Sequence, residues 1–252
     1  MNRQIEQNTI DIPAGGGIFS HYRALWFFMF NRKKGDNKKK MGRYFARLVM
    51  SELEEFTRLE EKHILDVGGG RGFFCSVFKQ ERRCTAINLE PFPKEIDYPE
   101  TVQGMGHHLP FPGDSFDIVL SRGVLEHIPP HWQQPTVNDM YRVTRRGGLC
   151  YILIPPWYNP HAGHNLKPFH IFPFAIAKRL RRLVFGNKIV ENSYAEAHLY
   201  KITFRRMKKM IEAAGFEIAG IKDTHLRLHF MAKLPILREL FIPAAAFIAV
   251  KR

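Results

Sequence analysis

Short runs of mostly apolar residues recur along the chain, and longer segments with helical periodicity separate several of them. The apolar runs cover residues 64–67, 84–89, 116–120, 149–154, 216–221 and 244–250. Such short runs are typical of strands that are buried within a sheet. Apolar residues recur at helical spacing over residues 41–60, 132–146 and 203–214. Strands that alternate with helices predict an α/β protein with a mostly parallel sheet.

The first predicted strand ends in a glycine-rich turn. Asp66 stands near the end of this strand, and the turn contains Gly68, Gly69, Gly70 and Gly72. An apolar run follows and can start a helix. Strand, glycine turn and helix together place a small ligand at the carboxyl edge of a parallel sheet. The turn lacks the third glycine of a dinucleotide fingerprint and the lysine of a P-loop, so neither of those ligands is indicated.

A second acidic residue closes the next predicted strand. Glu90 follows the run at residues 84–89 and stands twenty positions after Gly70. An acidic side chain at this place can accept hydrogen bonds from both hydroxyls of a ribose. The alternative is a strand-end carboxylate that only faces solvent. The placement after the glycine turn favours the ribose role.

Five elements occur in an order and spacing typical of one enzyme family. They are the glycine turn after Asp66, the acid Glu90, the pair Leu109-Pro110-Phe111 and Ser115-Phe116-Asp117, the segment 124–128, and the segment 146–149. Residues 60–156 thereby resemble the class I S-adenosylmethionine-dependent methyltransferases, in particular those related to quinone-biosynthesis enzymes. The resemblance implies a doubly wound, seven-stranded, mostly parallel sheet of the Rossmann-like type with an antiparallel last strand. It also implies S-adenosylmethionine as the cofactor.

The resemblance implies that nine residues bind the cofactor. They are Asp66, Gly68, Gly69, Gly70, Gly72, Glu90, Gly106, Ser121 and Gly123. The glycine turn would hold the amino-acid end of the cofactor, with Asp66 near its ammonium group, and Glu90 would hold the ribose. Ser121 and Gly123 would border the methionine part and the methyl group. Family members often carry an acid after the third strand; Met105 stands there in this chain, so the main chain beyond it would have to contact the adenine.

An insertion at residues 155–200 carries histidines that would lie over the same edge of the sheet. It combines proline, tryptophan and tyrosine with His161, His164 and His170, as a lid over an acceptor would. We predict His164 as a general base and His127, which follows the fourth strand, as a second candidate. His127 could instead begin a helix with a structural hydrogen bond. The three lid histidines have no cysteine or acid partner at a zinc-type spacing, so no metal is expected.

Composition limits the architecture and the cellular setting. The chain has 252 residues, 45% of them hydrophobic, which suffices for one large α/β domain. Cys75, Cys84 and Cys150 are an odd number without metal-type spacing, and the N-terminus shows no secretory pattern. No apolar run reaches the ~18–20 residues of a membrane span. We therefore expect a cytoplasmic protein with reduced thiols.

Two basic segments contribute to a net charge of +14, which suggests a polyanionic partner. Residues 22–30 are rich in aromatic side chains and precede cations at 32–40. Residues 173–190 have an amphipathic pattern, with four cations between Lys178 and Arg182. Such segments can dock on anionic lipid head groups, which would bring the protein to the inner face of the membrane. They could also bind RNA or be solvated helices. We expect residues 1–60 to form a tail with basic amphipathic helices and residues 61–252 to form the methyltransferase domain.

These patterns predict O-methylation of a sugar or a lipid-linked acceptor at a membrane surface. The expected partner is therefore a small-molecule or lipid-linked acceptor. Carbon methylation of a quinone precursor is a second alternative, and RNA methylation is a third. We do not expect nucleic acid as a partner, because the chain lacks a recognisable RNA-binding module and a base-flipping motif. A non-catalytic methyltransferase-like subunit is the alternative outside the enzymes, and only Met105 supports it.

Overall fold

The computed structural model describes residues 18–31, 37–92, 98–186, 188–225, 230 and 234–252. The chain divides into two compact units, Met1–Thr57 and Arg58–Arg252. The described part of the first unit is a pair of helices, α1 (Ile18–Asn31) and α2 (Asn37–Glu54). Of the predicted N-terminal tail, residues 1–17 lie outside the described residues, and α1 begins at Ile18. Of the predicted cationic run, residues 32–36 lie outside the described residues.

Helices α1 and α2 are joined by a small cluster of their own. Ala24 of α1 packs with Tyr44 and Leu48 of α2. His21 Nδ1 lies 2.6 Å from the Tyr44 hydroxyl, which fixes the two helices at this point. Trp26 stays largely exposed on α1. The aromatic segment at 22–30 is therefore part of helix α1. His21 marks the side of this helix that bonds to α2.

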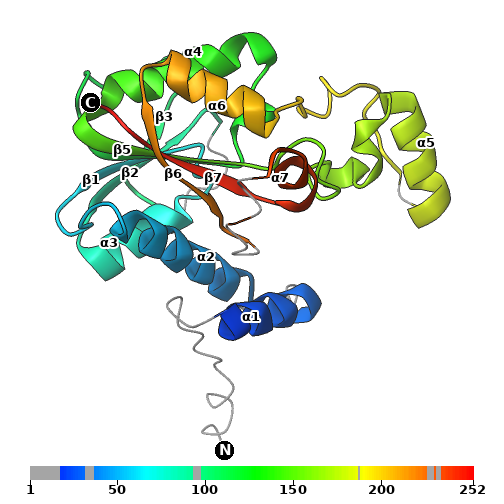
Figure 1. Ribbon diagram of the computed structural model, residues 1–252, viewed down its shortest axis with the longest axis horizontal. Coiled ribbons are helices and arrows are strands. Elements are labelled where there is room, and N and C mark those ends of the chain that lie inside the picture. The colour runs from blue at the N-terminus through cyan, green and yellow to red at the C-terminus, as the bar shows by residue number, and fades with distance from the viewer. Residues whose placement is uncertain (1–17, 32–36, 93–97, 187, 226–229, 231–233) are drawn as a thin grey trace, which may run out of the picture. The chain divides into compact units, whose positions relative to one another are not determined.

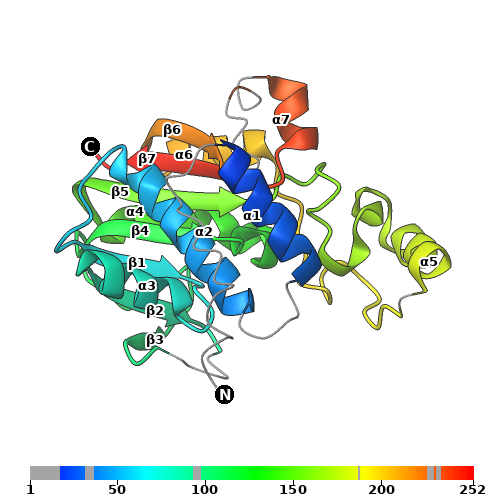
Figure 2. The same cartoon turned by 90° about the horizontal axis from the view of Figure 1, so that it is seen from below.

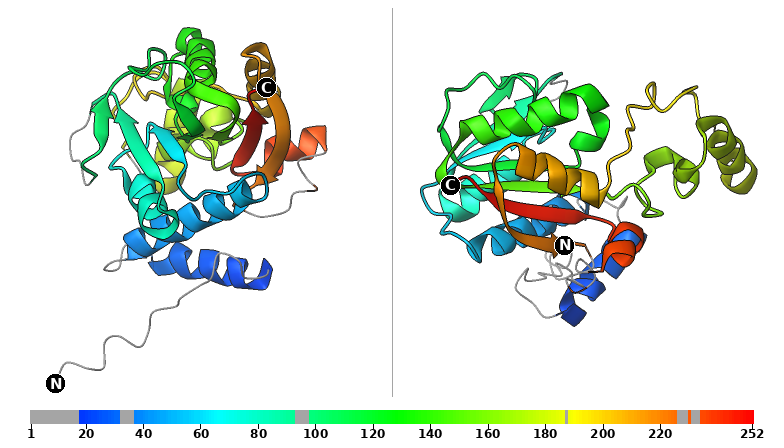
Figure 3. Two further views of the ribbon diagram at one scale, coloured as in Figure 1. Left: turned by 90° about the vertical axis from the view of Figure 1, so that its left-hand side faces the viewer. Right: turned by 45° about the horizontal axis from the view of Figure 1, so that its top comes forward.

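The second unit is built on a seven-stranded sheet. Its strands are β1 (His63–Val67), β2 (Thr85–Glu90), β3 (Thr101–Gln103), β4 (Phe116–Arg122), β5 (Thr144–Ile154), β6 (Glu217–Asp223) and β7 (Ala245–Val250). Their order across the sheet is β3-β2-β1-β4-β5-β7-β6. Strand β7 is antiparallel to both β5 and β6, and the other pairs are parallel (Figure 3). The predicted doubly wound sheet with an antiparallel last strand is confirmed.

The second unit also contains α-helices. They are α3 (Phe73–Arg82), α4 (Pro130–Val143), α5 (Phe174–Phe185), α6 (Phe204–Ala213) and α7 (Pro235–Phe241). Figure 1 shows α4 and α6 over one face and α3 on the opposite face. The short buried runs predicted from the sequence are therefore strands that are covered on both sides, as in other mostly parallel sheets. None of the described helices combines the length and apolarity that a membrane span requires.

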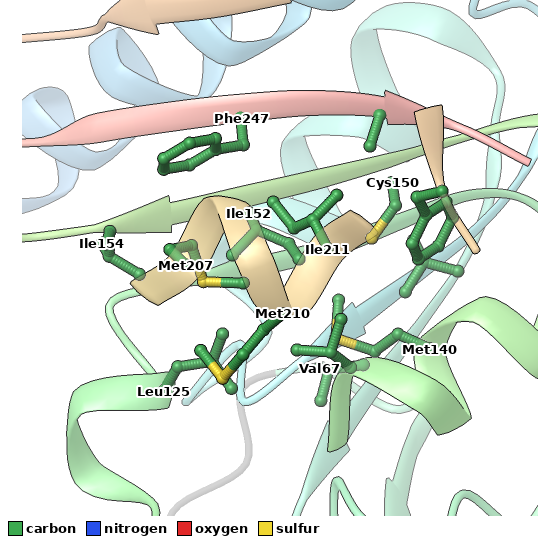
Figure 4. Packing of buried hydrophobic residues seen from close by; sticks show 14 of the residues in the cluster. Val67, Leu125, Met140, Cys150, Ile152, Ile154, Met207, Met210, Ile211 and Phe247 are labelled. Carbon is green, nitrogen blue, oxygen red and sulfur yellow. The ribbon is translucent and has the colours of Figure 1, made fainter. Parts of the chain in front are cut away.

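The main hydrophobic core lies between the sheet and the helices α4 and α6. Figure 4 shows β5 and β7 facing α6, with β1, α4 and the turn after β4 below. The labelled core side chains are Val67, Leu125, Met140, Cys150, Ile152, Ile154, Met207, Met210, Ile211 and Phe247. Val67 and Leu125 belong to this core and also border the carboxyl edge of the sheet. Tight packing of both residues therefore fixes the loops that follow β1 and β4.

The helix predicted at residues 132–146 is wrong at its end. Helix α4 stops at Val143, and β5 begins at Thr144. Thr144 takes an extended conformation, and its hydroxyl donates a hydrogen bond to the carbonyl of Met140 at 2.7 Å. Gly147 and Gly148, directly after the predicted helix, lie inside β5, where its pairing with β4 shifts register between Phe116 and Ile118. These glycines therefore belong to an irregular part of the strand rather than to the end of a helix.

The segment between β5 and α6 corresponds to the predicted lid, residues 155–200. It contains two single-turn helices, η3 (His164–Leu166) and η4 (Phe169–Ile171), followed by α5. Trp157, Leu166 and Ala177 form part of a separate small core within it. Figure 2 shows α5 set apart from the sheet, beyond the end of β5.

Thr203 caps the N-terminus of α6, because its hydroxyl oxygen accepts a hydrogen bond from the Arg206 backbone N–H at 3.1 Å. Replacing Thr203 with alanine should lower the free energy of unfolding by about 1 kcal/mol. Thr203→Ser keeps the hydroxyl and should be close to wild type. Urea unfolding of both variants measures the effect, and equal losses in both would contradict the capping role.

Candidate functional site

The carboxyl ends of β1, β2 and β4 meet at one edge of the sheet. Strand β1 lies between β2 and β4, and the strand order changes direction between β1 and β4. Ligands of open α/β sheets bind at such a switch point. The register pairs Asp66 with Asn88 on β2, and Val67 with Ser121 on β4. Asp66 and Ser121, predicted from separate parts of the sequence, thus lie at the ends of neighbouring strands.

The glycine turn after β1 is tightly packed at both ends and open at its centre. Gly68 has a φ of 74°, and a Cβ there would lie 2.6 Å from a methyl carbon of Val124. Gly72 also has a φ of 74°, and a Cβ there would lie 2.3 Å from Tyr98. At Gly70 a Cβ would meet nothing within 4 Å. The main chain at Gly70 therefore remains accessible to a ligand.

Glu90 reaches the centre of this turn. The backbone N–H of Gly70 donates a hydrogen bond to the Glu90 carboxylate. The side-chain amide of Asn88 donates to the Gly70 carbonyl at 2.9 Å. Partial burial raises the pKa of Glu90, and the Gly70 N–H opposes this shift. The predicted ribose-binding acid and the glycine turn therefore lie together, and Asn88, which was not predicted from the sequence, holds the turn in place.

Asp66 is buried and pairs with Arg122, a residue that was also not predicted. Arg122 Nη2 lies 3.2 Å from Asp66 Oδ2. The Arg122 guanidinium carbon lies 3.2 Å from the centre of the Phe74 ring. This pair balances the charge of a carboxylate that is removed from water. Arg122 ends β4, so its place at this edge follows from the strand pattern, whereas its pairing with Asp66 does not.

Gly106 and Gly123 lie in loops that border the same edge. A Cβ at Gly106 would lie 3.5 Å from Val67, so the loop after β3 packs against the end of β1. Gly123 has a φ of 66°, and its N–H donates to the Leu153 carbonyl at 2.9 Å. The structure thus gathers the predicted cofactor residues around one edge. Their individual roles in binding stay predictions.

Several buried polar atoms at this edge have no hydrogen-bond partner among the described residues. They are Asp66 Oδ1, Asn88 Oδ1 and Ser121 Oγ. Such atoms are rare in native proteins, and they commonly mark the place of a ligand or a water molecule. Carboxylate, amide and hydroxyl groups can pair with the ammonium and ribose hydroxyls of an adenosyl amino acid. The residues present therefore fit S-adenosylmethionine.

The predicted catalytic residues His127 and His164 lie together beyond the end of β4. Their ring centres are 4.7 Å apart, with the planes at 63°. The buried Glu126 joins them, and the carboxylate and imidazole ligand atoms of all three residues lie within 4.8 Å of one another. Glu126 was not predicted, although it stands next to His127 in the sequence. Helix η2 (Leu125–His127) positions both residues.

A backbone hydrogen bond and two unusual backbone conformations occur at this cluster. His127 Nδ1 lies 2.7 Å from the His198 carbonyl oxygen. A carbonyl oxygen only accepts, so we assign the proton to Nδ1 and the free lone pair to Nε2. His164 and His198 have φ angles of 47° and 46°. Such conformations of non-glycine residues cost about 1–3 kcal/mol each and concentrate at functional sites.

Within the cluster Glu126 is buried, whereas the residues His127 and His164 are exposed. Burial raises the pKa of the Glu126 carboxyl to about 8. Partial burial of its ring, and then the neighbouring His127, lower the pKa of His164. Near neutral pH the His164 ring is therefore uncharged, and it can accept a proton.

The other two lid histidines do not join this cluster. His170 is fully buried, and its Nε2 lies 2.7 Å from the Trp157 carbonyl oxygen. His161 is exposed. In the part of the chain that the structure describes, one group of three possible metal donors occurs, and it is Glu126, His127 and His164. Two imidazoles and a carboxylate can bind zinc in catalytic sites, so the absence of a metal stays a prediction.

The free energy of unfolding should carry a pH dependence from Glu126. Its pKa is about 8 in the folded protein against 4.5 ordinarily, so the folded chain keeps a proton that the unfolded chain loses. The stability contribution is fully present below about pH 4.5 and is lost as pH rises through about 8, by at most about 1.4 kcal/mol per pH unit. Glu126→Gln should remove this slope. Urea unfolding of both proteins between about pH 5 and about pH 8 tests this, and parallel curves would contradict it.

Comparison with known proteins identifies relatives along most of the chain. A family model described as a methyltransferase domain matches residues 65–152. An uncharacterized methyltransferase of Mycobacteroides abscessus is 31% identical over an alignment of 201 residues, covering 75% of this chain and 76% of the relative. An uncharacterized methyltransferase of Mycobacterium marinum is 33% identical over 189 residues, covering 71% and 72%. Neither name specifies an acceptor, so the relation to quinone biosynthesis stays a prediction.

Two solved structures share the fold. A SAM-dependent methyltransferase from Archaeoglobus fulgidus has a TM-score of 0.54 at 17% identity, covering 90% of this chain and 99% of that chain. A TehB-like SAM-dependent methyltransferase from Corynebacterium glutamicum has a TM-score of 0.55 at 16% identity, covering 92% and 96%. Sheet order, the packed glycine turn and these relatives agree. The chain therefore belongs to the class I S-adenosylmethionine-dependent methyltransferases, and S-adenosylmethionine is its methyl donor.

Proposed function

We propose that this methyltransferase O-methylates a hydroxyl group of a sugar or lipid-linked acceptor at a membrane surface. The observation that carries the proposal is the cluster of Glu126, His127 and His164, whose ligand atoms lie within 4.8 Å of one another. The cluster adjoins Gly123, which is predicted to border the methyl group. A Cβ at Gly123 would lie 3.4 Å from Glu126 Oε1. Glu126 therefore places the cluster, which includes the proposed base His164, close to the predicted methionine end of the cofactor site.

An alcohol is a weak nucleophile and benefits from a base that removes its proton, whereas a thiolate or amine acceptor needs none. When bound, S-adenosylmethionine supplies a methyl group on a positively charged sulfur, which the acceptor oxygen displaces. His164 would take the hydroxyl proton. His127, held by the His198 carbonyl, would orient the His164 ring that it contacts edge to face. Fixed positioning of the acceptor by the lid would add to the rate.

The surface of the lid also supports the proposal that the acceptor is carried by a lipid. Helix α5 leaves Ile176, Leu183 and Phe185 largely exposed, and four cations lie between them. Such a surface is typical of helices that lie in a membrane interface. The same lid segment carries His164 on η3. Base and amphipathic helix are therefore parts of one insertion.

Transfer from S-adenosylmethionine labelled with ¹³C in its methyl group tests the proposal. Octyl glucoside, a polyprenyl-phosphate-linked hexose, a prenylated hydroquinone and transfer RNA serve as separate acceptors. Carbon NMR distinguishes a methyl group on oxygen from one on carbon. We expect label on the oxygen of a sugar acceptor. Label on a ring carbon of the hydroquinone, or only in RNA, would contradict the proposal and favour the corresponding alternative.

Treatment with a chelator distinguishes proton transfer by His164 from catalysis by a bound metal. We expect the enzyme to keep its activity after dialysis against EDTA. If activity is lost and zinc or magnesium restores it, Glu126, His127 and His164 form a metal site, and His164 is not the base.

A further inference from the structure

A groove beside α5 combines cations with apolar side chains, and the proposed catalytic step does not use it. Its volume is about 560 Å³. The side chains that line it are mainly Lys178, Arg179, Arg182, Lys188, Ile189 and Val190. No acidic residue occurs among the described residues of its lining. Figure 2 shows that α5 stands away from the sheet, so the groove is separate from the cofactor edge.

The cations of α5 lie on different faces of the helix and make different contacts. Arg182 stands four positions after Lys178 and three after Arg179, so the three cations share one face of the helix. Lys178 Nζ donates to the Glu191 carbonyl at 2.8 Å, which ties the helix to the chain beyond the groove. Arg181 lies on another face, donates to the Lys167 carbonyl and stacks over the Phe185 ring. Arg181 thus supports the lid internally, while Arg179 and Arg182 line the groove.

Large apolar side chains are exposed beside these cations. Leu183 stands four positions after Arg179 on the same face of α5 and is 70% exposed. Val190, in the wall of the groove, is 85% exposed. Adjacent exposed apolar side chains mark interaction surfaces. Cations next to apolar side chains match a phosphate group that is attached to a hydrocarbon chain.

We propose that this groove binds the phosphate head group of an anionic lipid, and that α5 thereby docks the lid on a membrane. The argument is charge complementarity: four cations without an acidic lining residue attract a phosphate. Leu183 and Val190 can enter the hydrocarbon beside it. A free phosphate would leave these two side chains in water. A nucleic acid would find no aromatic ring among the described lining residues on which a base could stack.

Docking of α5 would reach the active site through direct packing. Helix α5 packs on both η3 and η4, and η3 begins at His164. A lipid-linked acceptor in the same membrane would then be presented to His164. This last step rests on the proposed function, whereas the lipid site depends only on the groove.

Co-sedimentation with vesicles tests the lipid site, using the full chain without cofactor or acceptor. The wild-type protein should bind phosphatidylcholine vesicles that contain phosphatidic acid, and should not bind pure phosphatidylcholine. Arg179→Gln/Arg182→Gln should weaken binding about 30-fold, because each cation near an anionic surface contributes about fivefold. Arg205→Gln/Lys209→Gln is the matched control, since it removes the same charge from two exposed residues of α6. This control should bind as the wild type does.

Each contrary result overturns the lipid site. Equal losses in the two double variants would show a diffuse attraction of a basic protein. Undiminished binding of Arg179→Gln/Arg182→Gln would show that the groove does not contact the vesicle. Equal binding to pure phosphatidylcholine would show that the head group of phosphatidic acid is not recognised. Leu183→Gln/Val190→Gln should also weaken vesicle binding; if it does not, and inorganic phosphate competes fully, the groove binds a free anion instead.

The two proposals fail separately. Every variant is checked by circular dichroism and by its affinity for S-adenosylmethionine, both of which should match the wild type. Vesicle binding through α5 without methylation of any sugar acceptor would keep the lipid site and overturn the proposed function. Methylation of octyl glucoside without vesicle binding would overturn the lipid site and keep O-methylation.

Discussion

Replacing His164 with alanine should reduce turnover with a sugar acceptor by on the order of 10²–10⁴-fold, the usual contribution of a general base. The affinity for S-adenosylmethionine should not change, because His164 belongs to the lid and not to the cofactor edge. The loss should be largest for an alcohol acceptor, because a base must remove its proton. It should be small for an acceptor that is already deprotonated. Initial rates together with calorimetric titration of the cofactor measure the two effects.

His161→Ala is the matched control for this experiment. His161 is an exposed histidine of the same lid, and its side chain is not part of the cluster. Its removal should leave turnover near the wild-type value. Unchanged turnover in His164→Ala would exclude His164 as the base. Equal losses in both variants would show that the lid needs its histidines for folding rather than for proton transfer.

Replacing Gly70 with alanine should weaken the binding of S-adenosylmethionine about 10- to 100-fold, since an added methyl group would occupy space at the centre of the glycine turn. Gly70 has a φ of 62°, and a Cβ there would contact no protein atom within 4 Å. The protein itself therefore has room for the methyl group, and only a ligand would meet it. Alanine in this left-handed conformation should also cost about 1–2 kcal/mol of stability. Titration calorimetry and urea unfolding measure the two terms.

Gly147→Ala separates these two terms. Gly147 has a φ of 74°, and a Cβ there also meets nothing within 4 Å. It lies in the first part of β5, away from the carboxyl ends of β1 and β4. The variant should lose similar stability and keep the affinity for the cofactor. Equal affinity losses in both variants would mean that strain, and not occupied space, weakens binding.

Local patterns were sufficient for most of the fold and for part of the site. The glycine turn and Glu90 were predicted from spacing, and the structure joins them by the hydrogen bond from the Gly70 N–H. The end of α4 was predicted wrongly, because Gly147 and Gly148 are helix terminators by propensity but here lie in β5, where its register with β4 shifts. Propensity describes the isolated segment, whereas pairing with β4 decides the conformation that this segment adopts.

The sequence by itself determined the order of strands and helices, which depends on the spacing of apolar residues, a local property. The antiparallel last strand and the cofactor class followed from the resemblance of its short motifs to those of the methyltransferase family. Only the tertiary structure decided that Arg122 pairs with Asp66, that Glu126 and His127 meet His164, and that His170 turns inward to Trp157. These contacts join segments far apart in the chain, and the folding of the lid beyond β5 sets their geometry. No local pattern encodes such distances, because they follow from the packing of the whole second unit.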